Sequence, residues 1–170
     1  LSEYFYVESF RDGMASFAEF QRGKLIDSGK RETKEKNGTL VKFTPDPNLF
    51  IGYKYRMEYI ETMIKNYSYL KKGLALNFNG TTYKSENGLL DLVNDSLGET
   101  PLYAPIHLIG DDIEVCITHG KSYGEEYYSF VNGQHTSQGG THQSAFREAV
   151  SRTIKEFFGR NFEYSDIRSG

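Results

Sequence analysis

The residues best suited to chemistry lie in a polar loop that leads into an amphipathic helix near the C-terminus. Gly139-Gly140-Thr141 stands at the predicted start of this helix, where backbone N–H groups and the helix dipole attract anions. The loop lacks the lysine of a complete phosphate-binding motif, so a purely structural role for the two glycines is an equal alternative. Thr141 is expected to be the N-cap, and the His142 imidazole to satisfy nearby backbone groups.

A second set of residues has side chains that ligate metals. It comprises His107, His119, His135, His142 and Cys116. No two of them have the close spacing of a zinc site, and the sequence therefore predicts no metal site. Spacing also identifies no Ser/His/Asp arrangement, so we assign no catalytic residue to this chain.

The helix that follows the loop is predicted over residues 141–158. Its apolar side chains recur at helical spacing and are Ala145, Phe146, Ala149, Val150, Ile154, Phe157 and Phe158. Arg147, Arg152 and Lys155 occupy the remaining surface together with acidic residues, and Glu148/Arg152 and Arg152/Glu156 are four residues apart. With the β-prone run 127–131 before it, this region is a β-loop-α unit with a basic stripe.

The N-terminal region is rich in strand patterns. Residues 3–10 and 14–20 flank the turn Arg11-Asp12-Gly13 and predict a hairpin. The polar stretch 22–37 mixes lysines with acids, which favours a solvated hairpin extension over a phosphate-contacting arm. Residues 38–43 alternate as a strand with Thr39, Val41 and Phe43 on one face.

The middle of the chain alternates helices and short strands. Asp46-Pro47 is expected to start a helical turn, and a helix is predicted over residues 53–72. Asn79-Gly80 is a type I′ hairpin turn. Further elements are a short helix at 88–97 and strands at 106–109 and 113–118, whereas residues 162–170 contain no finished element.

Composition limits the classes of function. The chain has 170 residues, 38% of them hydrophobic, which is enough for a folded core. Its net charge of -3 and pI of about 5.8 argue against a generally basic nucleic-acid binder. A single cysteine excludes an internal disulfide and agrees with a cytoplasmic location. No run is long enough to cross a membrane, and the first residue, Leu1, suggests a piece of a longer protein.

Three motifs give the chain a strong family resemblance. Ser129–Asn132 reads S-F-V-N, Gly139–His142 reads G-G-T-H, and the helix then carries the pair Phe146-Arg147. In this order they resemble the ATPase subunit of type IIA DNA topoisomerases, and the topoisomerase IV branch more closely than the gyrase branch. The match continues, in collinear order, through Leu1–Glu3, Arg11–Gly13, Gly38–Phe43, Pro45-Asp46 and Tyr164–Gly170.

The resemblance implies an α+β fold made of two pieces. Residues 1–87 are similar to the C-terminal half of the ATP-binding domain of the gyrase, MutL and histidine-kinase superfamily. Residues 88–170 are similar to the first part of a transducer domain, a two-layer β-α fold also found in ribosomal proteins. The family's glutamate base, magnesium-binding asparagine and γ-phosphate lysine have no counterpart here, so we expect no ATP hydrolysis by this chain alone.

The resemblance also assigns roles to individual residues. Thr39 matches the threonine on the floor of the adenine pocket, Val41 an apolar wall residue, and Arg11 an arginine at the pocket rim. Arg147 matches a helix arginine that faces the DNA cavity of the closed dimer, and Arg152 is a second candidate on a neighbouring surface. Without the resemblance, Thr39 and Val41 would be ordinary strand residues and Arg147 an exposed arginine paired with an acid.

For the intact protein the resemblance implies ATP and Mg²⁺ as cofactors, with none bound by this chain alone. The implied partners are DNA, the separate DNA-cleaving subunit of the topoisomerase and a second copy through the ATPase domain, with no membrane. The implied activity is ATP-dependent DNA strand passage, and the sequence leaves decatenation and supercoiling open. The alternatives are a non-enzymatic nucleic-acid-binding module of the same fold and a MutL-type mismatch-repair ATPase.

Overall fold

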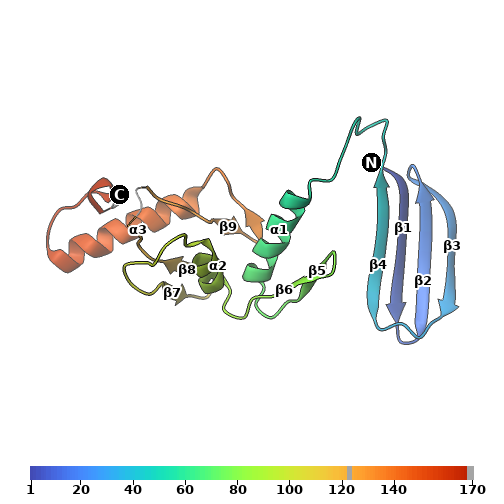
Figure 1. The fold of residues 1–170 in the computed structure, drawn as a ribbon, viewed down its shortest axis with the longest axis horizontal. Helices are drawn as coiled ribbons and strands as arrows, with labels where there is room; N and C mark the ends of the chain where they lie inside the picture. Colours follow the sequence, from blue (N-terminus) through green and yellow to red (C-terminus); the bar gives the residue numbers. More distant parts are fainter. Residues whose placement is uncertain (122–123, 168–170) are drawn as a thin grey trace. The chain divides into compact units, whose positions relative to one another are not determined.

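The computed structural model describes residues 1–121 and 124–167 and divides into two compact units, Leu1–Arg56 and Met57–Gly170 (Figure 1). Helices and antiparallel sheets are both present, which confirms the predicted α+β class. In the described ranges no helix combines the length and the apolar character that crossing a bilayer requires. The domain boundary expected at residue 87 falls inside the second unit, where α1 contacts elements before and after residue 87. The division of function at residue 87 stays a prediction.

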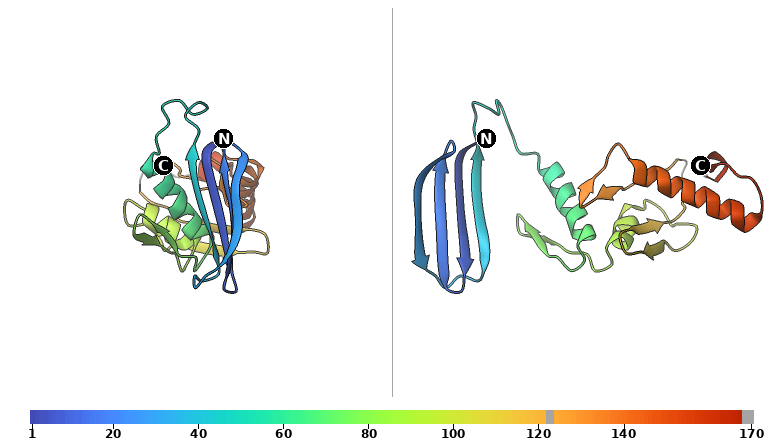
Figure 2. Two further views of the ribbon diagram at one scale, coloured as in Figure 1. Left: turned by 90° about the vertical axis from the view of Figure 1, so that its right-hand side faces the viewer. Right: turned by 180° about the vertical axis from the view of Figure 1, so that it is seen from behind.

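The first unit is a four-stranded antiparallel sheet in the order β3-β2-β1-β4 (Figure 1). Its strands are β1 Ser2–Arg11, β2 Met14–Gln21, β3 Lys24–Glu32 and β4 Gly38–Pro45. Figure 2 shows the same strands from two further sides. Residues 1–56 contain no helix that could cover either face of this sheet.

Two tight turns build the first three strands into consecutive hairpins. Asp12 and Gly13 have φ of 52° and 82°, and Arg22 and Gly23 have φ of 47° and 79°. Two consecutive residues with positive φ make the type I′ turn, whose twist matches that of paired strands. The predicted first hairpin is confirmed, and the polar stretch after Gln21 is the expected solvated hairpin, since β3 pairs with β2 and is mostly exposed.

One face of the sheet is organised around a buried carboxylate. Glu8 is only 4% exposed, and its Oε1 lies 2.7 Å from Arg31 Nη2 on β3. Tyr6 donates its hydroxyl to Glu8 Oε2 at 3.0 Å and stacks on Phe17 with ring centroids 6.1 Å apart. Gly29 lies against Phe17, because a Cβ at this position would come within 2.8 Å of the ring. Charge pairing and ring stacking therefore cover the middle of this face.

The segment after β4 forms a turn, and the next helix begins later than predicted. Asp46 accepts from the backbone N–H of Asn48 at 2.9 Å and pairs with Arg22 Nε at 3.0 Å. The helix expected from residue 53 instead begins at Met57, as α1 Met57–Leu70. The ring of Tyr53 packs edge-on against that of Tyr55 at 5.0 Å, and this local aromatic contact takes the place of a first helical turn.

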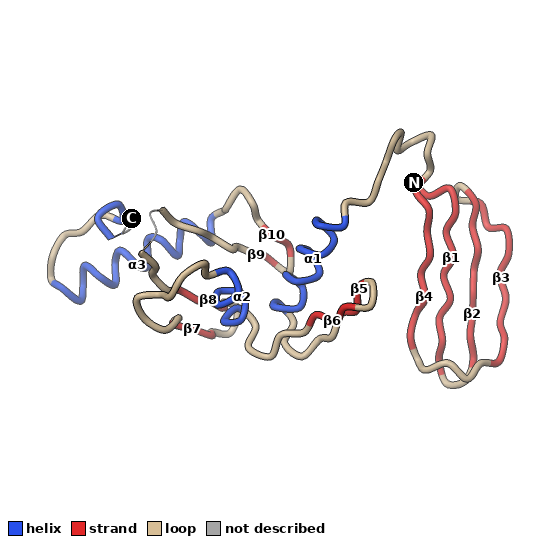
Figure 3. The backbone as a smooth tube through the Cα atoms, in the orientation of Figure 1, coloured by secondary structure: helices blue, strands red, loops and turns tan. Residues whose placement is uncertain are grey.

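The second unit contains the remaining helices and short strands. In order they are α1 Met57–Leu70, β5 Leu76–Phe78, β6 Thr81–Tyr83, α2 Leu89–Ser96, β7 Ile106–Ile109, β8 Glu114–Ile117, β9 Phe130–Val131, β10 Gln134–His135, α3 Thr141–Phe158 and α4 Tyr164–Ile167. The predicted turn at Asn79-Gly80 is confirmed, with φ of 49° and 85°. In Figure 3 the short hairpin of β9 and β10 is joined to α3 by a loop.

Helices α1 and α2 pack together around a small core. Leu92 on α2 is 3% exposed. Tyr69 on α1 donates its hydroxyl to Asp95 Oδ2 at 2.7 Å, which joins the two helices. Burial, followed by the hydrogen bond to Asp95, raises the pKa of Tyr69 to about 12. Tyr69 is therefore a neutral donor at any physiological pH.

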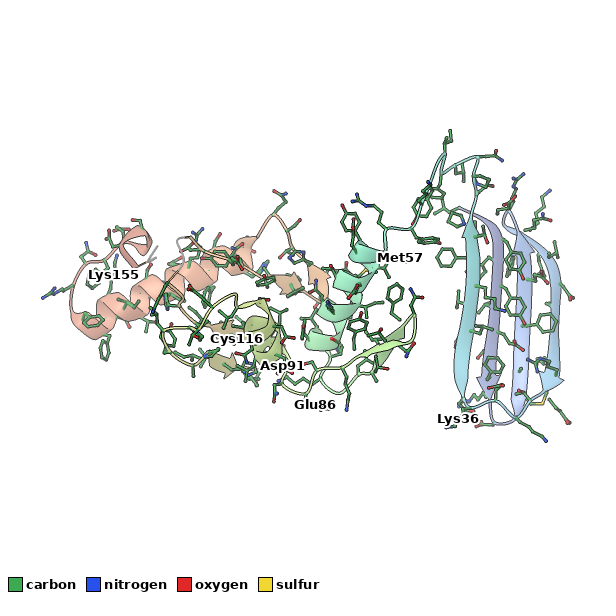
Figure 4. The ribbon with its side chains drawn as sticks, viewed as in Figure 1. Lys36, Met57, Glu86, Asp91, Cys116 and Lys155 are labelled. Carbon is green, nitrogen blue, oxygen red and sulfur yellow. The ribbon has the colours of Figure 1, made fainter. Side chains whose placement is uncertain are left out.

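The turn that starts α2 is closed by one carboxylate, Asp91, labelled with Glu86 in Figure 4. Asp91 accepts from the backbone N–H and the side chain of Asn87, both at 3.0 Å, and from Ser85 Oγ at 2.7 Å. These hydrogen bonds, those from Asn87 first, lower the pKa of Asp91. Several donors aimed at one carboxylate stabilise its charged form and fix the first turn of the helix.

Substituting Asp91→Asn should lower the melting temperature at pH 7, because the charged acceptor of the turn is lost. The folded-state pKa of Asp91 is lowered below its ordinary value of 3.8. Its stabilising contribution is therefore complete well above pH 3.8 and is lost as the pH falls through the folded-state pKa. Thermal unfolding of both proteins across pH 7 to 3 should show their difference shrinking at the acidic end. Asp112→Asn, in an exposed turn, is the control, and a constant difference for Asp91→Asn would contradict this assignment.

Candidate functional site

The first candidate surface is one face of the sheet in the first unit. The pairing of β1 with β4 sets Thr39 opposite Ser9 and Val41 opposite Val7. Arg11 lies two residues beyond Ser9 on β1, and alternate residues of a strand share a face. The register therefore brings Thr39, Val41 and Arg11 to the same face, near the same end of the sheet.

This face is apolar and open within its own unit. The exposed fractions of Val41, Phe43 and Met14 are 51%, 55% and 44%. Thr39 is an exposed residue, and the Arg11 side chain is 85% exposed, with its Nε 3.5 Å from Asp12 Oδ2. A flat apolar wall beside a hydroxyl and a cation suits a planar heteroaromatic group with an attached anion.

The second candidate surface is an open groove of about 620 Å³ along α3. Its lining consists of Ser144, Arg147, Glu148, Ser151, Arg152, Lys155 and Glu163. Arg147, Ser151 and Lys155 are spaced four apart and so share one side of the helix; Figure 4 labels Lys155. Both arginines predicted to face DNA thus line the same groove.

The two arginines have different surroundings. Arg147 Nη2 lies 3.0 Å from Glu125 Oε2, and its guanidinium stands 5.5 Å from the centre of the Tyr127 ring. Arg152 pairs at 3.0 Å with Glu148, one helical turn away, as predicted from the spacing. The Arg147 side chain is 39% exposed and that of Arg152 is 67% exposed. Arg147 is therefore paired with a residue of another segment, whereas the partner of Arg152 is on the same helix.

The start of α3 differs from the prediction in one respect. Gly140, not Thr141, is the N-cap, no side chain caps the helix, and Thr141 is its first residue. Gly139 has a φ of 73°, which L side chains rarely adopt, and Ser144 donates its backbone N–H to the Gly140 carbonyl at 3.1 Å. The glycine pair thus turns the chain into the helix. Thr141 lies one residue after the N-cap position and therefore does not cap the helix.

The imidazole of His142 is part of a side-chain cluster that the sequence did not reveal. Its Nε2 is 2.5 Å from Ser129 Oγ and 3.3 Å from Thr136 Oγ1. Thr136 also donates to the Ser129 carbonyl at 3.0 Å. The expectation that His142 would satisfy the backbone is wrong, because its partners are hydroxyl groups. This cluster ties the start of α3 to residues just before and after the β9–β10 hairpin.

Two of the other candidate metal ligands, His107 and His119, have separate hydrogen-bond partners. His107 Nε2 lies 2.7 Å from Glu114 Oε1, and His119 is hydrogen-bonded to the hydroxyl of Tyr103. Burial, and then the Glu114 charge, raises the pKa of the Cys116 thiol. Across residues 1–121 and 124–167, no three His, Cys, Asp or Glu side chains gather as metal ligands would.

Comparison with known proteins agrees with both the fold and the motifs. Residues 57–166 match the DNA gyrase B family. The B subunit of DNA topoisomerase 4 from Borreliella burgdorferi is 39% identical over 100% of this chain and 28% of that protein. The B subunit of DNA gyrase from Streptococcus pyogenes serotype M3 is 30% identical over 95% of this chain and 27% of that protein.

A solved structure has the same fold. The 43K ATPase domain of Thermus thermophilus gyrase B, in complex with an aminocoumarin, superposes with a TM-score of 0.71 and 28% identity. The similarity covers 96% of this chain and 50% of that one. The chain is thus an α+β protein of the gyrase ATPase-domain class.

Within that class, the chain belongs to the DNA gyrase B family, which confirms the resemblance found in the sequence. It spans 28% and 27% of the lengths of the two relatives above.

The hydroxyl–imidazole cluster predicts a measurable contribution to stability. Ser129→Ala removes the 2.5 Å partner of His142 Nε2, and a lost hydrogen bond of a part-buried pair should lower the free energy of unfolding by about 1 kcal/mol. Denaturant unfolding measures this difference. Ser137→Ala, at an exposed position of the same loop, is the matched control, and equal effects of the two substitutions would rule out the cluster as a tie.

Proposed function

We propose that this chain is part of the ATPase subunit of a type IIA DNA topoisomerase, which uses ATP to pass one DNA duplex through another. The observation that carries the proposal is the alignment over the whole chain with the topoisomerase 4 relative at 39% identity. The two surfaces described above agree with it, since one suits a nucleotide and the other suits a phosphate backbone.

The nucleotide surface would use Thr39, Val41 and Arg11. An adenine ring would lie against the apolar wall at Val41, with the Thr39 hydroxyl available for a hydrogen bond and Arg11 at the rim. The exposed apolar face fits this ligand because a planar base buries well on such a surface. ATP supplies the hydrolysable phosphate bond when bound, and Mg²⁺ would be held by residues of the intact protein other than these three.

The DNA surface would be the groove along α3. Arg147 and Arg152 are the cations expected to contact phosphates, and such contacts position a duplex without reading its sequence. This property suits an enzyme that must transport any duplex. The overall charge of -3 makes a local patch the reasonable site for the contact.

We assign residues 1–87 to the ATP-binding part of the enzyme and residues 88–170 to the transducer that relays nucleotide state to the DNA gates. ATP binding would bias the protein toward a closed homodimer, a population shift driven by contacts made only in that state. The partners would be DNA and the separate subunit that cleaves DNA. We assign the protein to the cytoplasm, which its single cysteine supports.

Thr39→Val tests the nucleotide surface in the full-length protein. It keeps the size and branching of the side chain but removes the hydroxyl, and one lost hydrogen bond should raise the KM for ATP roughly five- to tenfold. Steady-state ATPase assays give this value. Thr39→Ser retains the hydroxyl and should stay near wild type. An unchanged KM for Thr39→Val would show that the Thr39 hydroxyl does not contribute to ATP binding.

Arg147→Gln tests the DNA surface and, with it, the proposed activity. The full-length protein, combined with the DNA-cleaving subunit, should separate interlinked DNA circles only with ATP. Arg147→Gln should weaken DNA-stimulated ATPase and strand passage. It should also reduce the slope of log affinity against log salt concentration by about one, the contribution of one phosphate contact.

The control is Arg160→Gln, an exposed arginine that does not line the groove. If both variants bind and stimulate like wild type, the groove is not the DNA surface. Duplex binding without any ATP-dependent strand passage would favour a non-enzymatic nucleic-acid-binding module.

A further inference from the structure

The Arg147 guanidinium already has an anionic partner in this structure. Glu125, 22 residues earlier in the sequence, places Oε2 3.0 Å from Arg147 Nη2. Tyr127 donates its hydroxyl to the same oxygen at 3.1 Å, and its ring lies 5.5 Å from the guanidinium. Glu125, Tyr127 and Arg147 therefore each contact the other two.

A carboxylate and a DNA phosphate are alternative ligands for an arginine. Both are anions with oxygen acceptors, and both bind guanidinium N–H groups in the same geometry. A phosphate that approaches Nη2 through the groove must replace or share Glu125 Oε2, because the carboxylate stands at hydrogen-bond distance from that nitrogen.

We propose that Glu125 is an internal competitor of DNA phosphate for Arg147 and thereby sets the DNA concentration at which the groove is occupied. This inference rests on the proposed DNA role of Arg147. It goes beyond that role by naming the residue that opposes it.

The second arginine of the groove shows why Glu125 matters more than other nearby acids. The Arg152–Glu148 pair has side chains that are 67% and 73% exposed, whereas those of the Arg147–Glu125 pair are 39% and 22% exposed. Exposed pairs are screened by water and salt and exchange partners at little cost. Arg152 can accept a phosphate at once, whereas Arg147 must first give up a more sheltered partner.

The backbone near Glu125 is anchored, so the Glu125 side chain can leave Arg147 while the neighbouring backbone stays in place. Four residues further on, Ser129 is hydrogen-bonded to His142 on α3 and to Thr136. Displacing the Glu125 carboxylate breaks its ion pair with Arg147 and the hydrogen bond from Tyr127, and it leaves this anchor in place. The competition therefore needs a side-chain movement and no rearrangement of α3.

Glu125→Gln is the decisive substitution, studied in the full-length protein with a short linear duplex of random sequence as probe. Glutamine keeps the shape of glutamate and one acceptor oxygen, but it removes the charge that competes with phosphate. Duplex affinity should rise about two- to fivefold, in keeping with the value of a partly exposed ion pair. Half-maximal stimulation of the ATPase should move to correspondingly lower DNA concentration.

Glu126→Gln is the matched control. It makes the same charge change at the next residue, where the carboxylate contacts Tyr128. Any general gain from removing a negative charge appears in both variants. A greater gain for Glu125→Gln supports competition. Equal gains, or weaker binding by Glu125→Gln, overturn it, and the latter would mean that Glu125 orients Arg147 toward DNA.

The Arg147→Gln background separates this proposal from the one on which it rests. There Glu125→Gln should lose its advantage over Glu126→Gln, because the residue for which it competes is gone. If Arg147→Gln alone leaves duplex affinity unchanged, both proposals fail together. If Arg147→Gln weakens binding while Glu125→Gln and Glu126→Gln behave alike, only the competition fails.

Discussion

The hydrogen-bonded cluster of Ser129, Thr136 and His142 is the constraint on which the C-terminal surface depends. It joins the start of α3 to the residues that flank the β9–β10 hairpin. Glu125 and Tyr127 lie just before this anchor, and Arg147 lies just after it on the helix. Two segments that are far apart in sequence are thereby held at a separation where a guanidinium can meet a carboxylate and an aromatic ring. Without the anchor, Arg147 would be an ordinary exposed helix residue, worth little in any one contact.

In the first unit, strand register has the corresponding role. A shift of one residue between β1 and β4 would send Thr39 and Val41 to the face that carries Tyr6 and Glu8, because side chains alternate across a strand. The ion pair between buried Glu8 and half-exposed Arg31 helps to specify that face, since a carboxylate that is 4% exposed needs its partner. The apolar face with Thr39 and the polar, aromatic face with Glu8 are thus two consequences of one register.

The chain also shows how an acidic protein can present a basic surface. A net charge of -3 gives no general attraction for DNA, yet three cations of α3 line one groove. Acidic side chains in and around this groove, Glu148 and Glu125 among them, pair with the same arginines. The charge that a DNA duplex would meet depends on how firmly each of these pairs is held, which total charge does not reveal.

The features of this protein that depend on neighbouring residues could be predicted from the sequence. The turns at Asp12-Gly13 and Asn79-Gly80 and the apolar spacing of α3 depend only on neighbouring residues, and all were predicted correctly. The family followed from motifs in collinear order, and with it the residues to examine. Tertiary structure alone decided that α1 begins at Met57, that Gly140 rather than Thr141 caps α3, and that His142 binds hydroxyl groups. It alone also paired Arg147 with Glu125, because the choice of a partner 22 residues away depends on how the chain folds back and leaves no periodic signal in the sequence.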